Sequence, residues 1–83
     1  MAYNKWKLLW SNRAEDDLSK IEKEDALRII NKVETQLVHN PIELGKKLIG
    51  KYQNYFRYRV SDYRILYALD KNEIKILILK VGI

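Results

Sequence analysis

Hydrophobic and polar residues alternate at the start of the chain. Trp6, Leu8 and Trp10 fall on one face of the segment from Tyr3 to Trp10, and this two-residue period predicts a strand. We expect both tryptophans to lie in the core or to pack against the helices that follow.

The hydrophobic spacing then changes to every third or fourth residue, which is typical of amphipathic helices. A first short helix is expected to begin at Ser11 or Asn12, because either residue can act as its N-cap. A second helix is predicted from Glu24 to Val38, and Pro41 is expected to end it. The predicted apolar stripe of this second helix consists of Ala26, Leu27, Ile30, Val33 and Leu37. Two neighbouring helices with a short charged connection indicate a helical hairpin.

The alternating pattern returns after an aperiodic stretch from Pro41 to Gln53. Three strands are predicted, at Tyr55 to Val60, Tyr63 to Asp70 and Glu73 to Val81, separated by two-residue turns. The expected fold is α+β, with a helical hairpin packed on a mostly antiparallel four-stranded sheet in the order β-α-α-β-β-β. A chain of 83 residues predicts a single domain that spans residues 1–83.

The first of these β-hairpins concentrates arginine on one face of the predicted sheet. With Ser61 and Asp62 as the turn, Arg59 lies opposite Arg64. Because side chains alternate along a strand, Arg57, Arg59 and Arg64 then share one face. A cluster of guanidinium groups without a carboxylate favours phosphate binding. The alternative is a solvated sheet face whose arginines serve solubility.

The same face is predicted to carry an uncovered apolar strip. With Lys71 and Asn72 as the second turn, Leu66 pairs with Leu77, and Arg64 pairs with Leu79. The strip consists of Leu66, Leu77, Leu79 and Val81. No third helix is expected to cover it, so the strip predicts a partner. An acidic amphipathic helix would bury the strip and neutralise the arginines, and self-association is the alternative.

Composition narrows the possible functions. A net charge of +5 favours an anionic partner such as nucleic acid, although many small proteins are basic for solubility. The lack of cysteine excludes disulfides and cysteine zinc sites, and suits the cytoplasm. His39 is the only histidine, so no metal or other cofactor is expected. No apolar run is long enough to span a bilayer, so no membrane role is expected. The acidic run Glu15–Asp17 is interpreted as a first helical turn that complements the helix dipole.

Residues near the arginines are further candidates for nucleic-acid contacts. Lys46, Lys47 and Lys51 flank the turns before the hairpin, either as a solvated loop or as contacts to the nucleic-acid backbone. Tyr55 shares the arginine face and is a candidate for base stacking or proton transfer.

Three segments of the sequence together resemble the RelE/ParE superfamily of bacterial toxins. "SNRAEDDLSKI" is similar to the first helix of that family, "KKLIG" to its Lys-Leu-x-Gly turn, and "YFRYRVSDYRILYALDKNEIKILILKVG" to its arginine hairpin and hydrophobic last strand. The resemblance implies the toxin of a type II toxin–antitoxin system, whose partner is an antitoxin with an acidic segment. It also implies a cellular target: RelE-like toxins cut mRNA in the ribosomal A site, and ParE-like toxins poison DNA gyrase.

The RelE-like hypothesis assigns catalytic roles to the arginines. Arg57 and Arg59 match the basic pair on the family's strand, and Arg64 matches the arginine after its turn. They would orient RNA and stabilise charge while the RNA 2′-hydroxyl acts as the nucleophile. Arginine is a poor acid or base because its pKa lies above 12. Ser61 stands where the family often has glycine.

Family members continue past the last strand into a tail that carries another arginine or histidine and usually a tyrosine. This sequence ends at "KVGI", and a natural truncation, a degenerate toxin and a shortened chain all remain open. The leading hypothesis is therefore a ribosome-dependent mRNA endoribonuclease. The alternatives are a gyrase inhibitor and a non-catalytic remnant that only binds antitoxin.

Overall fold

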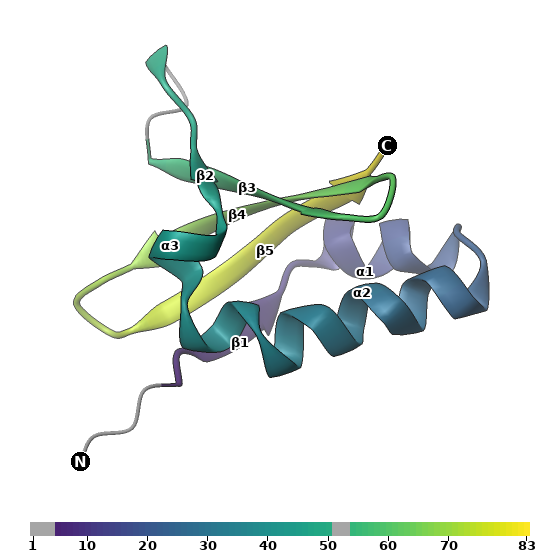
Figure 1. Ribbon diagram of the computed structural model, residues 1–83, viewed down its shortest axis with the longest axis horizontal. Coiled ribbons are helices and arrows are strands. Elements are labelled where there is room, and N and C mark those ends of the chain that lie inside the picture. Colours follow the sequence, from purple (N-terminus) through teal and green to yellow (C-terminus); the bar gives the residue numbers. More distant parts are fainter. Residues whose placement is uncertain (1–4, 51–53) are drawn as a thin grey trace.

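The computed structural model describes residues 5–50 and 54–83, which form a sheet with two long helices against one face (Figure 1). The elements in chain order are β1 (Lys7–Trp10), α1 (Asn12–Ser19), α2 (Lys23–Thr35), the 3-10 helix η1 (Leu37–His39), α3 (Pro41–Leu44), β2 (Lys46–Lys47), β3 (Tyr55–Val60), β4 (Tyr63–Asp70) and β5 (Lys75–Gly82). The strand order is β1-β5-β4-β3-β2. All pairings are antiparallel except that of β1 with β5. The predicted α+β fold is thus confirmed, and the sheet has an additional short strand, β2.

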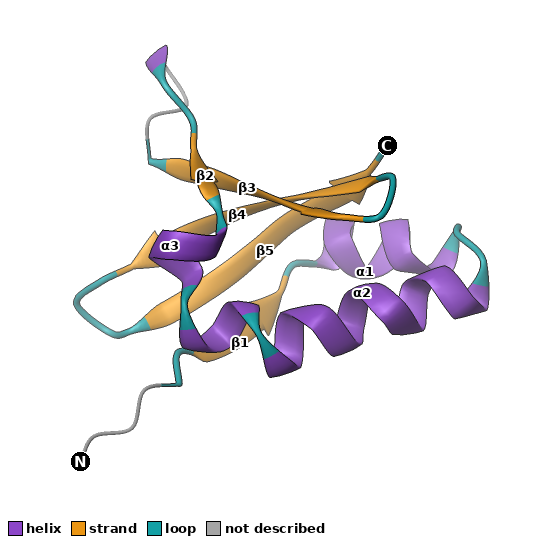
Figure 2. Ribbon diagram, viewed as in Figure 1, coloured by secondary structure: helices purple, strands orange, loops and turns teal. Residues whose placement is uncertain are grey.

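Helices α1 and α2 lie on the same side of the sheet (Figure 2), and we call the opposite side the open face. The Ser11 hydroxyl accepts a hydrogen bond from the Ala14 N–H at 3.0 Å, so Ser11 is the N-cap of α1. Trp6, Leu8 and Trp10 are half-buried and pack against the core, as the alternation in β1 predicts. The helical hairpin thus covers one face of the sheet and leaves the arginine-bearing face uncovered.

Helix α2 differs from its predicted form in both length and orientation. It ends at Thr35, and η1 follows where the helix was expected to continue. Ile29 and Val33 are completely buried, whereas Leu27 is 55% exposed, so its assignment to the apolar stripe was wrong. The physical reason is angular, because residues two apart on a helix lie roughly 200° apart around its axis and Leu27 therefore faces away from Ile29. Pro41 begins α3 rather than only ending α2, a position that suits its missing N–H.

The second hairpin turn is longer than predicted. The Asp70 carboxylate accepts hydrogen bonds from the N–H groups of Asn72 at 3.0 Å and Glu73 at 3.1 Å. This side-chain turn delays the start of β5 to Lys75. Ile74 adopts a left-handed backbone conformation with φ of 55° and is 48% exposed, so it belongs to the turn although the third strand was predicted to begin at Glu73.

A β-bulge then changes which β5 residues face the core. Leu66 pairs with Lys80, and Tyr67 pairs with Ile78, which leaves Leu79 as the extra residue. The Ser11 hydroxyl donates a hydrogen bond to the Leu79 carbonyl at 2.9 Å. The predicted pairings of Leu66 with Leu77 and of Arg64 with Leu79 were therefore wrong.

The core lies between the sheet and the helical hairpin. Its completely buried members include Ile29 and Val33 from α2 and Ile65, Tyr67 and Ile78 from the sheet. Within residues 5–50 and 54–83, every helix is too short or too polar to cross a lipid bilayer.

Candidate functional site

Basic side chains gather at one end of the open face. The pairings place Lys46, Arg57, Leu66 and Lys80 in one row across β2, β3, β4 and β5. The next row contains Arg59, Arg64 and Gly82. Every cation in the two rows is exposed. The structure thus brings Arg57, Arg59 and Arg64 together on one face, as the hairpin register predicts.

Two neighbouring hollows indent this basic surface. The β2-side hollow, of about 270 Å³, is lined by Lys46, Arg57, Arg59 and Arg64 with Leu44 and Gly45. The α1-side hollow, of about 420 Å³, is lined by the cations Arg13, Arg57, Arg64 and Lys80, with Leu48 and Leu66 among its apolar residues. Arg57 and Arg64 line both. The two hollows therefore form one continuous basic surface with a shared centre.

The electrostatics of the surface favour an anionic ligand. Within the described part of the chain, the lining of both hollows has no acidic side chain. The ion pairs of the described residues do not involve the cations of the two rows, Lys46, Arg57, Arg59, Arg64 and Lys80. Arg59 stands directly opposite Arg64, and such like-charge pairs destabilise a sheet slightly. Phosphate binding would remove this repulsion and satisfy the guanidinium donors bidentately.

The turn between β3 and β4 orients one of the arginines. The Arg59 Nε–H donates to the Ser61 carbonyl at 3.0 Å. Ser61 has a φ of 56°, the left-handed conformation that glycine adopts most easily, at the position where glycine is common in the family that the sequence resembles. Arg59 thus has one donor engaged in the turn and lines only the β2-side hollow.

Arg13 and Lys80 are members of the site that the sequence analysis missed. Lys80 lies on the open face only because of the bulge at Leu79. The alternation of apolar and polar residues in the sequence does not reveal this bulge. Arg13 lies on α1. The one sequence feature that could have indicated its role is Asp17 four residues later, a spacing typical of helical ion pairs.

Asp17 holds Arg13 and β5 together. The Arg13 Nε–H donates to Asp17 Oδ1 at 3.2 Å, and the Val81 N–H donates to Asp17 Oδ2 at 2.9 Å. Burial raises the pKa of Asp17, but the Val81 N–H, Arg13 and Lys20 together lower it by more, so the pKa lies below its ordinary value of 3.8. The interpretation of Glu15–Asp17 as a dipole-complementing turn alone was therefore wrong for Asp17.

The other predicted RNA-contacting residues are not all placed together. Lys46 lines the β2-side hollow. Lys47 pairs with Phe56 and borders a different hollow with Asp70, so the structure does not bring it to the arginines. Tyr55 is half-buried and lies opposite Ala68, two residues before Arg57 on the same strand face. Lys51 lies outside the described residues.

The apolar strip on the open face has a different composition from the predicted one. Val81 is only 6% exposed and faces the core, because the bulge reverses its side, so its assignment to an exposed strip was wrong. Leu77 is 37% exposed, while Leu66 and Leu79 are half-buried. Leu77 pairs with Ala68 on β4 and with Leu9 on β1, whose side chain is 41% exposed. An apolar row therefore crosses β1, β5 and β4 beside the basic rows.

A tyrosine on the core face is held away from the site. The Tyr63 hydroxyl donates to Asp25 Oδ2 on α2 at 3.0 Å. This hydrogen bond and partial burial raise the pKa of Tyr63 above its ordinary value of 10. Tyr63 therefore ties the hairpin to α2 and points away from the arginines.

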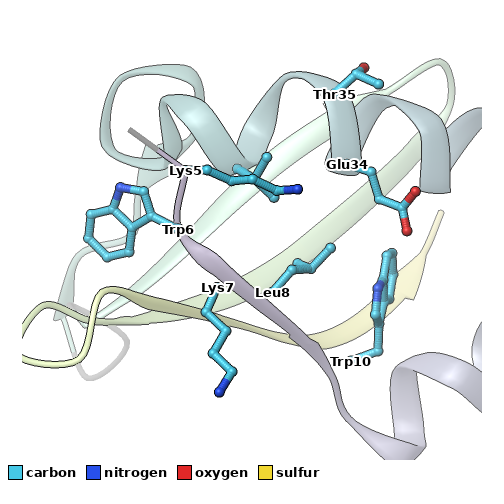
Figure 3. A pocket seen from close by; sticks show the side chains of 8 residues that line it. Lys5, Trp6, Lys7, Leu8, Trp10, Glu34 and Thr35 are labelled. Atoms are coloured by element: carbon cyan, nitrogen blue, oxygen red, sulfur yellow. The ribbon is translucent and has the colours of Figure 1, made fainter. Parts of the chain in front are cut away.

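A further hollow, of about 770 Å³, lies between β1 and the end of α2 (Figure 3). Leu8 and Trp10 project from β1 toward α2, where Glu34 lies near Trp10, and Lys7 points the opposite way. Because its lining combines Lys5 and Lys7 with Glu34, this hollow has no uniform charge to select an anion. Among the described residues, no three His, Cys, Asp or Glu side chains gather as metal ligands would.

The chain matches one protein family over almost its whole length. Residues 8–83 match the family described as ParE toxin of type II toxin-antitoxin system, parDE. Among curated protein sequences, none matches the chain significantly.

Several solved structures have a similar fold, among them three from bacteria. The toxin–antitoxin complex RelBE2 from Mycobacterium tuberculosis contains a chain with 24% identity and a TM-score of 0.90, covering 94% of this chain and 96% of that chain. The intact RelBE complex of E. coli matches with 18% identity and a TM-score of 0.76, covering 93% and 94%. A YoeB/ParE toxin from Agrobacterium tumefaciens matches with 20% identity and a TM-score of 0.72, covering 92% and 96%. At these identities the likeness establishes the fold.

Proposed function

Because the chain belongs to the family of ParE toxins of type II toxin–antitoxin systems, we propose that it is a toxin that acts on RNA. In this proposal it binds mRNA on the ribosome and cleaves it, which stops translation. The observation that carries the proposal is the basic surface, in which Arg57 and Arg64 line two adjoining hollows to which none of the described residues contributes an acidic side chain.

The surface suits the phosphates of an extended RNA strand. Guanidinium groups bind phosphate oxygens through two parallel hydrogen bonds, which fixes direction as well as charge. Arg57 and Arg64 lie on adjacent strands of a sheet, so their positions are set by the β3–β4 pairing rather than by a loop. A rigid arrangement of this kind stabilises charge that develops on phosphate during a reaction.

The reaction that these residues suit is transesterification. The 2′-hydroxyl attacks the adjacent phosphorus and releases its proton to water, the bond to the 5′-oxygen breaks, and a 2′,3′-cyclic phosphate and a 5′-hydroxyl result. Arg57 and Arg64 would bind the non-bridging oxygens as their negative charge increases. The ammonium groups of Lys46 and Lys80 line the hollows and could donate the proton that the departing 5′-oxygen requires.

The proposed ribosomal setting is supported by how little of the substrate the protein alone can enclose. Both hollows are shallow parts of an exposed sheet face, so the protein alone restricts an RNA strand weakly. A ribosome that already holds the codon extended would supply the orientation, and well-oriented reactants can gain about 7–11 kcal/mol of barrier reduction.

The second partner in this proposal is an acidic antitoxin. Two of the three structures named above are described as toxin–antitoxin complexes. On this chain the row of Leu9, Leu77 and Ala68 adjoins the basic rows. An amphipathic segment with acidic residues along one edge would bury the apolar row and neutralise the arginines at once.

Induced expression in bacteria, with sequencing of RNA 5′ ends, tests the proposal. Growth should stop, and new 5′-hydroxyl ends should appear in phase with codons. Growth arrest with intact messages and loss of DNA supercoiling would instead indicate a gyrase inhibitor. A folded protein that leaves growth unchanged would indicate a non-catalytic, antitoxin-binding chain.

A further inference from the structure

Arg13 reaches the basic surface from a helix rather than from the sheet. It is the second residue of α1, yet it lines the α1-side hollow with Arg64 and Lys80. Its side chain is 64% exposed, so the guanidinium is accessible to a ligand. Among the described residues, the only hydrogen bond of its guanidinium group is the one from Nε–H to Asp17. The four N–H donors on its two terminal nitrogens can therefore bind an anion.

Asp17 differs from an ordinary helical ion-pair partner. On the same helix and at the same i,i+4 spacing, Lys20 pairs with Asp16, whose side chain is 58% exposed. The Asp17 side chain is only 14% exposed, because it also accepts the Val81 N–H of β5. Ion pairs between exposed side chains contribute little to stability. Stability of the Arg13–Asp17 ion pair therefore does not explain why the Asp17 carboxylate is held in this position.

The geometry of the sheet edge supplies that explanation. β1 ends at Trp10, whose partner on β5 is Ile78. Beyond that point no strand formed by residues 5–50 or 54–83 pairs with β5 on the β1 side, so the N–H groups of β5 on that side need other acceptors. Asp17 satisfies the Val81 N–H, and this hydrogen bond fixes the carboxylate that orients Arg13. Arg13 is thus linked to the sheet through Asp17.

We propose that Arg13 binds a second phosphate of the same strand that Arg57 and Arg64 bind, and that Asp17 is the positioning residue that directs Arg13 to it. This inference rests on the proposed RNA-binding function. Arg57 and Arg64 line both hollows, whereas Arg13 lines only the α1-side hollow, so a strand that crosses both hollows would present one phosphate to each. The site therefore selects a polynucleotide segment rather than a single nucleotide.

Binding to a fluorescein-labelled single-stranded 2′-O-methyl RNA tests Arg13, since this probe cannot undergo 2′-hydroxyl cleavage. Fluorescence anisotropy over a salt series gives the affinity and its salt dependence. Arg13→Ala should weaken binding on the order of tenfold and lower the slope of log K against log salt by about 0.7, the value for one lost phosphate contact to a single strand. Arg28→Ala is the matched control, because Arg28 also pairs with an aspartate but lies on α2, behind the sheet. Equal effects of the two variants would overturn the role of Arg13.

Asp17→Asn tests the positioning role through the sign of its effect. Removing a negative charge should by itself strengthen binding to a polyanion, and Asp16→Asn should show that increase. If Asp17 directs Arg13, Asp17→Asn weakens binding instead, while the double variant with Arg13→Ala binds no worse than Arg13→Ala alone.

Stronger binding by Asp17→Asn would overturn the positioning role. Absence of RNA binding by the unsubstituted protein, or normal binding with an unaffected Arg13→Ala, would overturn this inference. Cleavage on the ribosome tests the proposed function separately.

Discussion

The Tyr67 ring occupies the space that a side chain at Gly45 would fill. A Cβ atom added to Gly45 would collide with the Tyr67 hydroxyl oxygen and lie 2.7 Å from its Cζ. The Tyr67 hydroxyl itself donates to the Pro41 carbonyl at 2.6 Å, and Tyr67 is completely buried. Gly45 connects α3 to β2, so this contact fixes the segment that carries Lys46 to the basic surface.

Gly45→Ala should therefore destabilise the protein and displace Lys46. A methyl group forced into a packed core typically costs about 1–3 kcal/mol of the free energy of unfolding. Urea denaturation measures this loss. Gly82→Ala is the control, since an added Cβ at Gly82 meets nothing within 4 Å. Equal stabilities of the two variants would show that the Tyr67 contact does not constrain position 45.

Acid should weaken the link between α1 and β5. The pKa of Asp17 in the folded protein lies below its ordinary 3.8, so its stabilising effect is fully present above that value and is lost as the pH falls below it. The difference in unfolding free energy between the unsubstituted protein and Asp17→Asn should therefore shrink as the pH is lowered from 5 through this window. Asp16→Asn provides the control with an exposed ion pair. A difference that stays constant with pH would contradict the linkage.

The arginines should contribute unequally to activity. Arg57→Ala and Arg64→Ala should each lower RNA cleavage by on the order of 10²–10³, the cost of one preorganised transition-state contact. Arg59→Ala should cost less, because Arg59 lines one hollow and has its Nε–H bound to Ser61. Cleavage rates of the purified variants, together with thermal melts to confirm folding, measure this order. A larger loss for Arg59→Ala than for Arg57→Ala would contradict it.

The apolar row should contribute to antitoxin binding. Burying a leucine side chain contributes about 1.5–3 kcal/mol, so Leu77→Glu should weaken the complex by roughly ten- to a hundredfold. Leu27→Glu is the matched control, because Leu27 is an exposed leucine on α2, on the other side of the molecule. Calorimetry with the antitoxin encoded beside this protein measures both. Light scattering of the protein alone tests the competing idea of a homodimer, which would also bury Leu77.

The sequence predicted the parts of the site that depend on local patterns. The two-residue turn at Ser61 and Asp62 fixes the β3–β4 register, so the shared face of Arg57, Arg59 and Arg64 followed from alternation alone. The α+β class followed from the change between helical and strand periods.

The missed parts depend on interactions between distant residues. The turn after Asp70 is longer than predicted because the Asp70 carboxylate accepts hydrogen bonds from two backbone N–H groups. At the bulge, the Leu79 carbonyl accepts a hydrogen bond from the Ser11 hydroxyl. As a result, Val81 lies in the core and Lys80 lies on the surface, the reverse of what strict alternation along β5 predicts. The alternation of apolar and polar residues could not reveal the longer turn or the bulge. Leu77, Leu79 and Val81 are all apolar, so this alternation does not show which of them faces the core.

Cleavage on a programmed ribosome tests the central claim most directly. Purified ribosomes that hold a defined mRNA are mixed with the protein, and primer extension with end-group analysis locates any cut. The account predicts a cut within the A-site codon, with a 5′-hydroxyl and a 2′,3′-cyclic phosphate, that requires the ribosome and is lost with Arg57→Ala or Arg64→Ala. Intact mRNA in the presence of folded, growth-inhibiting protein would contradict the account.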